Sequence, residues 1–148
     1  MKRDRLQKKN LNLPASGVIE KVKDRLSKYP NINYEEKERS LRVVAYSENG
    51  FGVEILDKDS SGEYTVFGHI WHEHLSDENE AINCFMSCLT KRVRLKVIAR
   101  GTSDVGASIE IFHDGLWSDG SSIGLFNLNF FQKKHVRYLQ NDWITPIH

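Results

Sequence analysis

The chain has 148 residues, of which 39% are hydrophobic and 28% are charged, and its formal net charge is +1. These values are close to globular averages, so they exclude an intrinsically disordered or fibrous chain. No apolar run approaches the roughly 18 residues that a membrane helix needs. No apolar segment follows the basic N-terminus either, so we expect neither a membrane contact nor a secretory signal.

The first nine residues hold five basic side chains and one carboxylate, and they lack apolar periodicity. We expect residues 1–13 to form a flexible basic arm and residues 14–148 to form a single α+β domain. A basic arm can bind the phosphate backbone of a nucleic acid. A solvated tail is the interpretation that we favour, because the charge is small and no aromatic side chain interrupts it.

The first helix is predicted to begin between Pro14 and Ser16. Its apolar side chains recur at the helical period, and Pro30 cannot continue the helix, so it is predicted to end at Tyr29. The apolar stripe consists of Val18, Val22, Leu26 and Tyr29.

The hydrophobic period changes to two between residues 32 and 75, which predicts strands. We expect strands at 32–37, 41–46, 51–56 and 64–72, joined by turns at 47–50 and 57–62, and hence an antiparallel meander. Asp57, Asp59, Ser61 and Gly62 resemble the start of a calcium-binding loop. Because Gly68 stands where that loop needs a glutamate, we interpret the segment as a turn.

The second helix has the clearest signal. Ser76 or Asp77 can cap it, and Glu80 has the spacing of a capping box with Asp77. Its predicted buried stripe is Ile82, Phe85, Met86 and Leu89.

Four further strands are predicted after the second helix, at 92–100, 108–112, 123–131 and 134–139, with a loop at 113–122. The whole pattern predicts an α+β fold. It is an antiparallel sheet of about six to eight strands with two helices packed on one face.

Only two cysteines occur, Cys84 and Cys88, four residues apart. A disulfide-stabilised secreted domain would use more cysteines at wider spacing. We therefore expect two reduced, buried thiols on one helix face and a cytoplasmic location. A redox or metal-binding role for the pair is the alternative.

The densest group of possible metal ligands is His69, His72, Glu73 and His74. On a strand, His72 and His74 project from one face, where two imidazoles can chelate an ion, while His69, Trp71 and Glu73 share the other face. No third ligand can be identified, so we expect no metal and no cofactor. A metal-dependent enzyme that uses His72 and His74 remains an alternative.

Arg92, Arg94 and Lys96 alternate along one strand, which predicts a basic stripe. A solvated sheet face explains such a stripe, and so does a docking surface for an acidic protein or a nucleic acid. No nucleophile elbow, phosphate-binding loop or dinucleotide motif occurs, which favours a protein without catalytic activity.

Our functional hypothesis is a non-catalytic cytoplasmic module that binds another protein, similar to inhibitor or immunity proteins by analogy alone. A nucleic-acid binder that uses the arm and the 92–96 stripe is a further alternative that we do not favour. The expected binding residues are Trp71, His72, His74, Arg92, Arg94 and Lys96.

Overall fold

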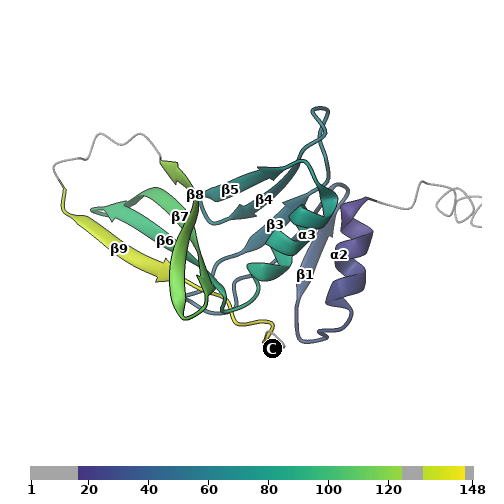
Figure 1. Ribbon diagram of the computed structural model, residues 1–148, viewed down its shortest axis with the longest axis horizontal. Helices are drawn as coiled ribbons and strands as arrows, with labels where there is room; N and C mark the ends of the chain where they lie inside the picture. Colours follow the sequence, from purple (N-terminus) through teal and green to yellow (C-terminus); the bar gives the residue numbers. More distant parts are fainter. Residues whose placement is uncertain (1–16, 125–131, 146–148) are drawn as a thin grey trace, which may run out of the picture.

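The computed structural model describes residues 17–124 and 132–145 (Figure 1). In this part of the chain, nine strands form two antiparallel sheets, accompanied by two helices. The predicted α+β class with antiparallel strands is confirmed, and the prediction of one sheet of six to eight strands is wrong. The predicted basic arm lies outside the described residues. No helix in the described part is long and apolar enough to cross a membrane.

The first sheet is a meander with the strand order β1-β2-β3-β4-β5. Its core-facing side chains are mostly apolar and those of its other face mostly polar, because successive residues of a strand point to opposite faces. The strands are β1 (Tyr34–Lys37), β2 (Ser40–Val43), β3 (Val53–Leu56), β4 (Tyr64–Gly68) and β5 (Trp71–Leu75).

The prediction of one long strand at 64–72 is wrong, because the chain reverses at His69 and Ile70. Gly68 pairs with Trp71, which leaves a hairpin loop of only these two residues. His69 supplies the left-handed backbone that such a tight loop needs, with φ 54°. His69 therefore does not share a strand face with Trp71 and Glu73.

Two helices accompany the first sheet. Helix α2 (Val18–Leu26) contacts α3 and β3, while α3 (Glu78–Ser87) contacts β3, β4 and β5. The prediction of two helices is confirmed, but they accompany the first of two sheets and do not share one face of a single sheet that holds every strand. Asp77 caps α3, as predicted, by accepting a hydrogen bond from the Asn79 N–H.

Helix α2 ends three residues earlier than predicted. The chain from 27 to 29 continues in tighter turns, in which the Lys28 N–H donates to the Arg25 carbonyl and the Tyr29 N–H donates to the Leu26 carbonyl. Such i→i−3 bonds are common where an α-helix ends.

The second sheet has the order β8-β7-β6-β9. The predicted loop at 113–122 is wrong, because Asp114 and Gly115 both adopt positive φ and form a tight turn between two long strands. The predicted strand at 123–131 is therefore the end of β8 as far as the described residues reach. The strands are β6 (Val93–Arg100), β7 (Ser103–His113), β8 (Leu116–Gly124) and β9 (Lys134–Leu139).

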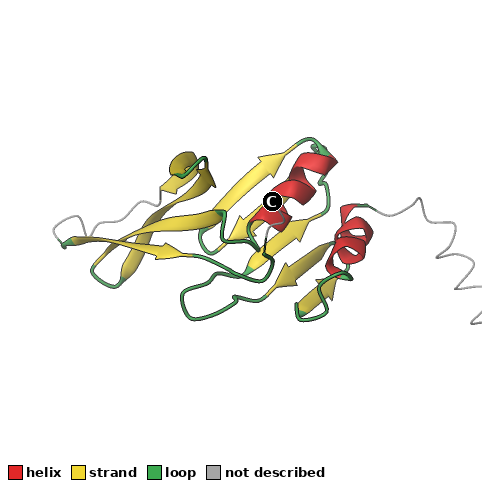
Figure 2. Cartoon of the chain, turned by 60° about the horizontal axis from the view of Figure 1, so that its bottom comes forward, coloured by secondary structure: helices red, strands yellow, loops and turns green. Residues whose placement is uncertain are grey.

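Both views place the four-stranded sheet at one end of the molecule and α2 at the other (Figures 1 and 2). One continuous set of buried apolar side chains nevertheless runs through both sheets and both helices. At the junction, the Trp71 indole N–H donates to Ser121 Oγ at 3.0 Å. Ser121 in turn donates to the Glu73 carboxylate, so β5 and β8 are joined by polar as well as apolar contacts.

The segment after β9 fastens the two sheets together through Asn141, which is fully buried. Asn141 Oδ1 accepts hydrogen bonds from the Tyr46 and Phe51 N–H groups, both at 3.1 Å. Its Nδ2 donates to the Phe51 carbonyl at 2.9 Å and to the Cys88 carbonyl at 3.0 Å. One side chain thus satisfies backbone groups of the loop before β3 and of the end of α3.

Candidate binding surface

The four-stranded sheet turns one face to the core and the other to solvent. Along β6, Val93, Leu95 and Val97 are buried, while the residues between them are half-buried on the opposite face. The register places large apolar side chains of β7, β8 and β9 beside these residues. We call this the outer sheet face, and it consists of Arg94, Lys96, Ile98, Phe112, Trp117, Lys134, Val136 and Tyr138.

Arg94 lies at the centre of the outer sheet face between two aromatic rings. Its guanidinium carbon is 4.0 Å from the Trp117 ring centroid and 4.1 Å from the Tyr138 ring centroid. Its Nε donates to Glu110 Oε1 at 2.7 Å, and Glu110 is only 7% exposed. Each cation–π contact stabilises this arrangement by roughly 0.5–1 kcal/mol. The arginine is therefore held in one orientation before any partner arrives.

Exposed apolar side chains lie on the same sheet face as this arginine. Phe112 is 40% exposed, and Val136 and Tyr138 are each 45% exposed. The Phe112 ring centroid is 5.2 Å from that of Trp117, so the aromatic cluster extends from β9 across the sheet to the β7–β8 hairpin. Scattered apolar side chains are normal on a surface, but a partly exposed aromatic cluster in contact with a fixed arginine is typical of an interaction site.

The outer sheet face also carries more positive than negative charge. Glu110 is engaged by Arg94, whereas Lys96 and Lys134 form no ion pair with any described residue. Asp119 lies opposite Glu110 on the neighbouring strand β8 and is the other carboxylate at this position along the described part of the sheet. The cations thus outnumber the carboxylates, which favours an acidic ligand.

The predicted binding residues do not all lie on this face. Arg94 and Lys96 do. Arg92 precedes β6, and its side chain lines a separate pocket beside the helices. Trp71 is 1% exposed and belongs to the core, so its ring is not presented to a partner.

His72 and His74 lie on the solvent-facing side of the first sheet, as their spacing predicts. Their ring centroids are 5.1 Å apart, and His74 Nδ1 is 3.0 Å from Thr65 Oγ1. Within residues 17–124 and 132–145, no three His, Cys, Asp or Glu side chains are placed to hold a metal ion. The two histidines are thus a neighbouring pair rather than part of a larger ligand set in the described chain.

His69 belongs to a different cluster that sequence reasoning missed. Its Nε2 is 2.7 Å from Asp104 Oδ2, and both Asp104 oxygens accept hydrogen bonds from the Arg137 guanidinium at 2.6 and 2.7 Å. The Arg137 hydrogen bonds, opposed by partial burial and aided by His69, lower the pKa of Asp104 to about 2. The cluster ties the β4–β5 hairpin to β7 and β9 and holds the left-handed backbone of His69.

The two cysteines lie on one face of α3 and at its end. Cys88 is fully buried and Cys84 is half-buried. A hydrogen bond with Cys84, together with burial, raises the pKa of the Cys88 thiol well above its usual range. Because the thiolate is the reactive form, Cys88 is unsuited to nucleophilic chemistry at neutral pH.

The segment that resembles the start of a calcium loop is a turn, as predicted. Asp59 Oδ1 accepts hydrogen bonds from the Ser61 N–H at 2.8 Å and the Glu63 N–H at 3.3 Å. Gly62 adopts φ 84°. The carboxylate is therefore used within the turn itself.

No protein-family model matches the chain, and no curated protein and no solved structure matches it at a significant level. The interpretation of the outer sheet face therefore depends on its own geometry and charge.

Proposed function

We propose that the protein is a non-catalytic binding module whose outer sheet face docks an acidic surface of another protein. The observation that carries the proposal is Arg94, fixed between Trp117 and the exposed ring of Tyr138, with the exposed Phe112 ring beside Trp117. Tryptophan, tyrosine and arginine are the residues that most often dominate the binding energy of protein interfaces. Here all three are in contact at the centre of one sheet face.

Preorganisation strengthens the case for a protein partner. A free arginine loses rotamer freedom when it binds, at a cost of about 0.5–1.5 kcal/mol. Arg94 is already held by Glu110 and the two rings, so most of this loss occurs during folding. Its remaining N–H groups can donate to a carboxylate on the partner.

The same geometry disfavours single-stranded nucleic acid. Bases bind such proteins by stacking on open faces of aromatic rings. One face of Trp117 and one face of Tyr138 are covered by the Arg94 guanidinium at about 4 Å. Lys96 and Lys134 supply long-range attraction to carboxylates at the rim of a protein interface.

The experiment combines capture with mapping. Proteins captured from a lysate are purified, and their affinity is measured for the parent and for the variants Arg94→Glu and Tyr138→Ala. Hydrogen exchange of the complex then locates the contact. We expect protection of β6, β8 and β9, and a loss of affinity of about 30-fold or more in each variant, as for a hot-spot residue.

Arg42→Glu is the matched control, since Arg42 is an exposed cation on the first sheet. It should retain the affinity of the parent. An Arg94→Glu variant that binds like the parent, or protection confined to the first sheet, would overturn the proposal. Binding of an oligo-dT probe that is lost in Arg94→Glu would assign the face to nucleic acid instead. A parent dimer that Arg94→Glu dissociates would assign it to a second copy of this chain.

A further inference from the structure

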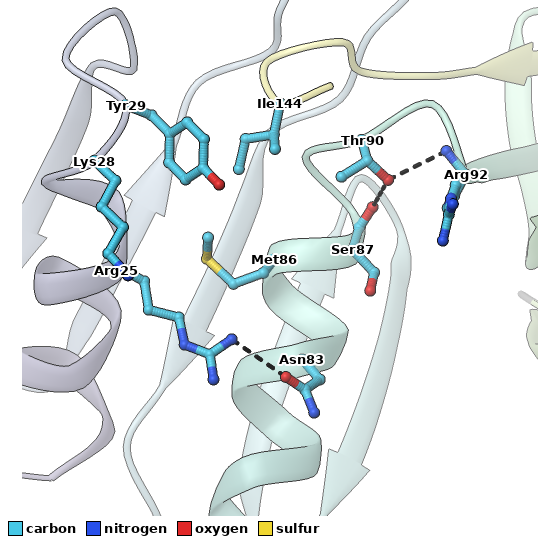
Figure 3. A pocket seen from close by; sticks show the side chains of 9 residues that line it. All are labelled: Arg25, Lys28, Tyr29, Asn83, Met86, Ser87, Thr90, Arg92 and Ile144. Carbon is cyan, nitrogen blue, oxygen red and sulfur yellow. Dashed lines mark hydrogen bonds between the residues drawn. The ribbon is translucent and has the colours of Figure 1, made fainter. Parts of the chain in front are cut away.

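A second site, which shares no residue with the outer sheet face, lies between α2 and α3 (Figure 3). It is a pocket of about 520 Å³ at the C-terminal ends of the two helices, closed on one side by the segment after β9. Pockets of this size hold small organic molecules. The lining residues are Arg25, Lys28, Tyr29, Asn83, Met86, Ser87, Thr90, Arg92 and Ile144.

Among the residues that the structure describes, three cations line the pocket, Arg25, Lys28 and Arg92, and no carboxylate does. Within the described chain, none of the three forms an ion pair, and Arg25 has only the Asn83 side-chain oxygen as a partner, at 3.3 Å. Each helix C-terminus contributes about half a negative charge. Two such ends offset only about one of the three positive charges, so the pocket keeps a positive potential.

The pocket has an apolar side as well. Figure 3 shows the Tyr29 ring, Met86 and Ile144 gathered on the side opposite Arg92. The Ser87 hydroxyl forms no hydrogen bond with a described residue, whereas the Thr90 hydroxyl is used, donating to the Ser87 carbonyl and accepting from the Arg92 N–H. The pocket thus combines cations, a free hydroxyl and an apolar wall.

We propose that this pocket binds a small organic anion. Its phosphate or carboxylate group interacts with Arg25 and Lys28, and its apolar body lies against Tyr29 and Met86, while Arg92 on the far side of the α3 end adds to the positive potential. Guanidinium groups bind both kinds of anion through paired hydrogen bonds. The inference does not depend on the proposed protein partner, because the two sites use different residues.

The test is a titration of the full chain with four probes, followed by amide chemical shifts. Phenyl phosphate and benzoate supply the two anions on an apolar body, benzyl alcohol is the neutral analogue, and inorganic phosphate lacks the apolar body. We expect phenyl phosphate or benzoate to shift the amides of Asn83 and Met86. Benzyl alcohol should bind at least about tenfold more weakly, because charged hydrogen bonds are lost. The ratio of the two anion affinities tells phosphate from carboxylate ligands.

A double variant that carries Arg25→Gln and Lys28→Gln should weaken anion binding by at least about tenfold without lowering the melting temperature, because both side chains are exposed. Lys58→Gln removes an exposed cation from the turn between β3 and β4 and should bind like the parent. Equal affinity in the double variant, shifts confined to other parts of the chain, or no shift with either anion at millimolar concentration would overturn the proposal.

Discussion

Replacing Asn141 by alanine is expected to destabilise the protein severely. The side chain is fully buried and makes four hydrogen bonds to backbone groups, three of them buried and one partly buried. A buried backbone group left without a partner costs about 1–3 kcal/mol. Since water can reach part of the vacated site, we expect a loss of about 3–5 kcal/mol in the free energy of unfolding.

Urea unfolding followed by tryptophan fluorescence measures this loss, provided the slope of the transition is unchanged. The melting temperature should fall by roughly 10 °C or more. Asn79→Ala is the matched control, because Asn79 is exposed on α3 and should change stability by less than about 0.5 kcal/mol. A loss below about 1 kcal/mol for Asn141→Ala would refute the argument that this amide joins the two sheets.

Three further predictions follow from burial and charge. Phe85→Ala should lower the free energy of unfolding by about 3–5 kcal/mol, because its ring is fully buried. Phe112→Ala on the outer sheet face should cost less than about 1.5 kcal/mol. Equal losses for the two variants in urea unfolding would contradict this. In the native protein, Cys88 should react with a thiol reagent far more slowly than Cys84, since its pKa is raised; mass spectrometry that finds Cys88 labelled first would disprove it. The pKa of Asp104 is lowered to about 2, so its charge contributes stability that is complete above about pH 4 and lost as the pH falls towards 2. Asp104→Asn should therefore be about 1–2 kcal/mol less stable at pH 7, and this difference should shrink as the pH falls through about 2; a difference that stays constant with pH would argue against the ion pair.

Elements with a local signal were predicted well. The Asp77 cap and the apolar period of α3 depend on neighbours within a few residues, and Ile82 and Phe85 are buried as expected. The alternation of Val93, Leu95 and Val97 likewise identified β6 and its buried face. In these segments the pattern and the tertiary packing agree, so the sequence is sufficient.

Reversals without a turn motif were missed. In the run from residue 64 to 72, β-branched and aromatic residues favour a strand on both sides of Gly68. The hairpin at His69 is stabilised instead by Asp104, thirty-five residues further along the chain, together with Arg137. A contact of that range leaves no local trace in the sequence.

The outer sheet face was predicted in part. Arg94 and Lys96 lie on one face of β6, as their alternation predicts, but their aromatic neighbours come from two other strands. The stretch around Trp117 is rich in Gly, Asp and Ser, a composition that predicts a loop. Only the register of β6, β7, β8 and β9 brings Trp117 and Tyr138 to either side of the arginine.

The hydrogen bonds of Asn141 also impose an order on folding during synthesis. Phe51 is made ninety residues before the side chain that pairs with both its N–H and its carbonyl. At about 5–20 residues per second, the loop before β3 waits roughly 5–20 s on the ribosome for this partner. Throughout that interval water must hydrate backbone groups that the finished protein buries. The first sheet therefore emerges early but reaches its native packing late, when residue 141 arrives, and the nascent meander is the stage at which a chaperone or a protease has access to it.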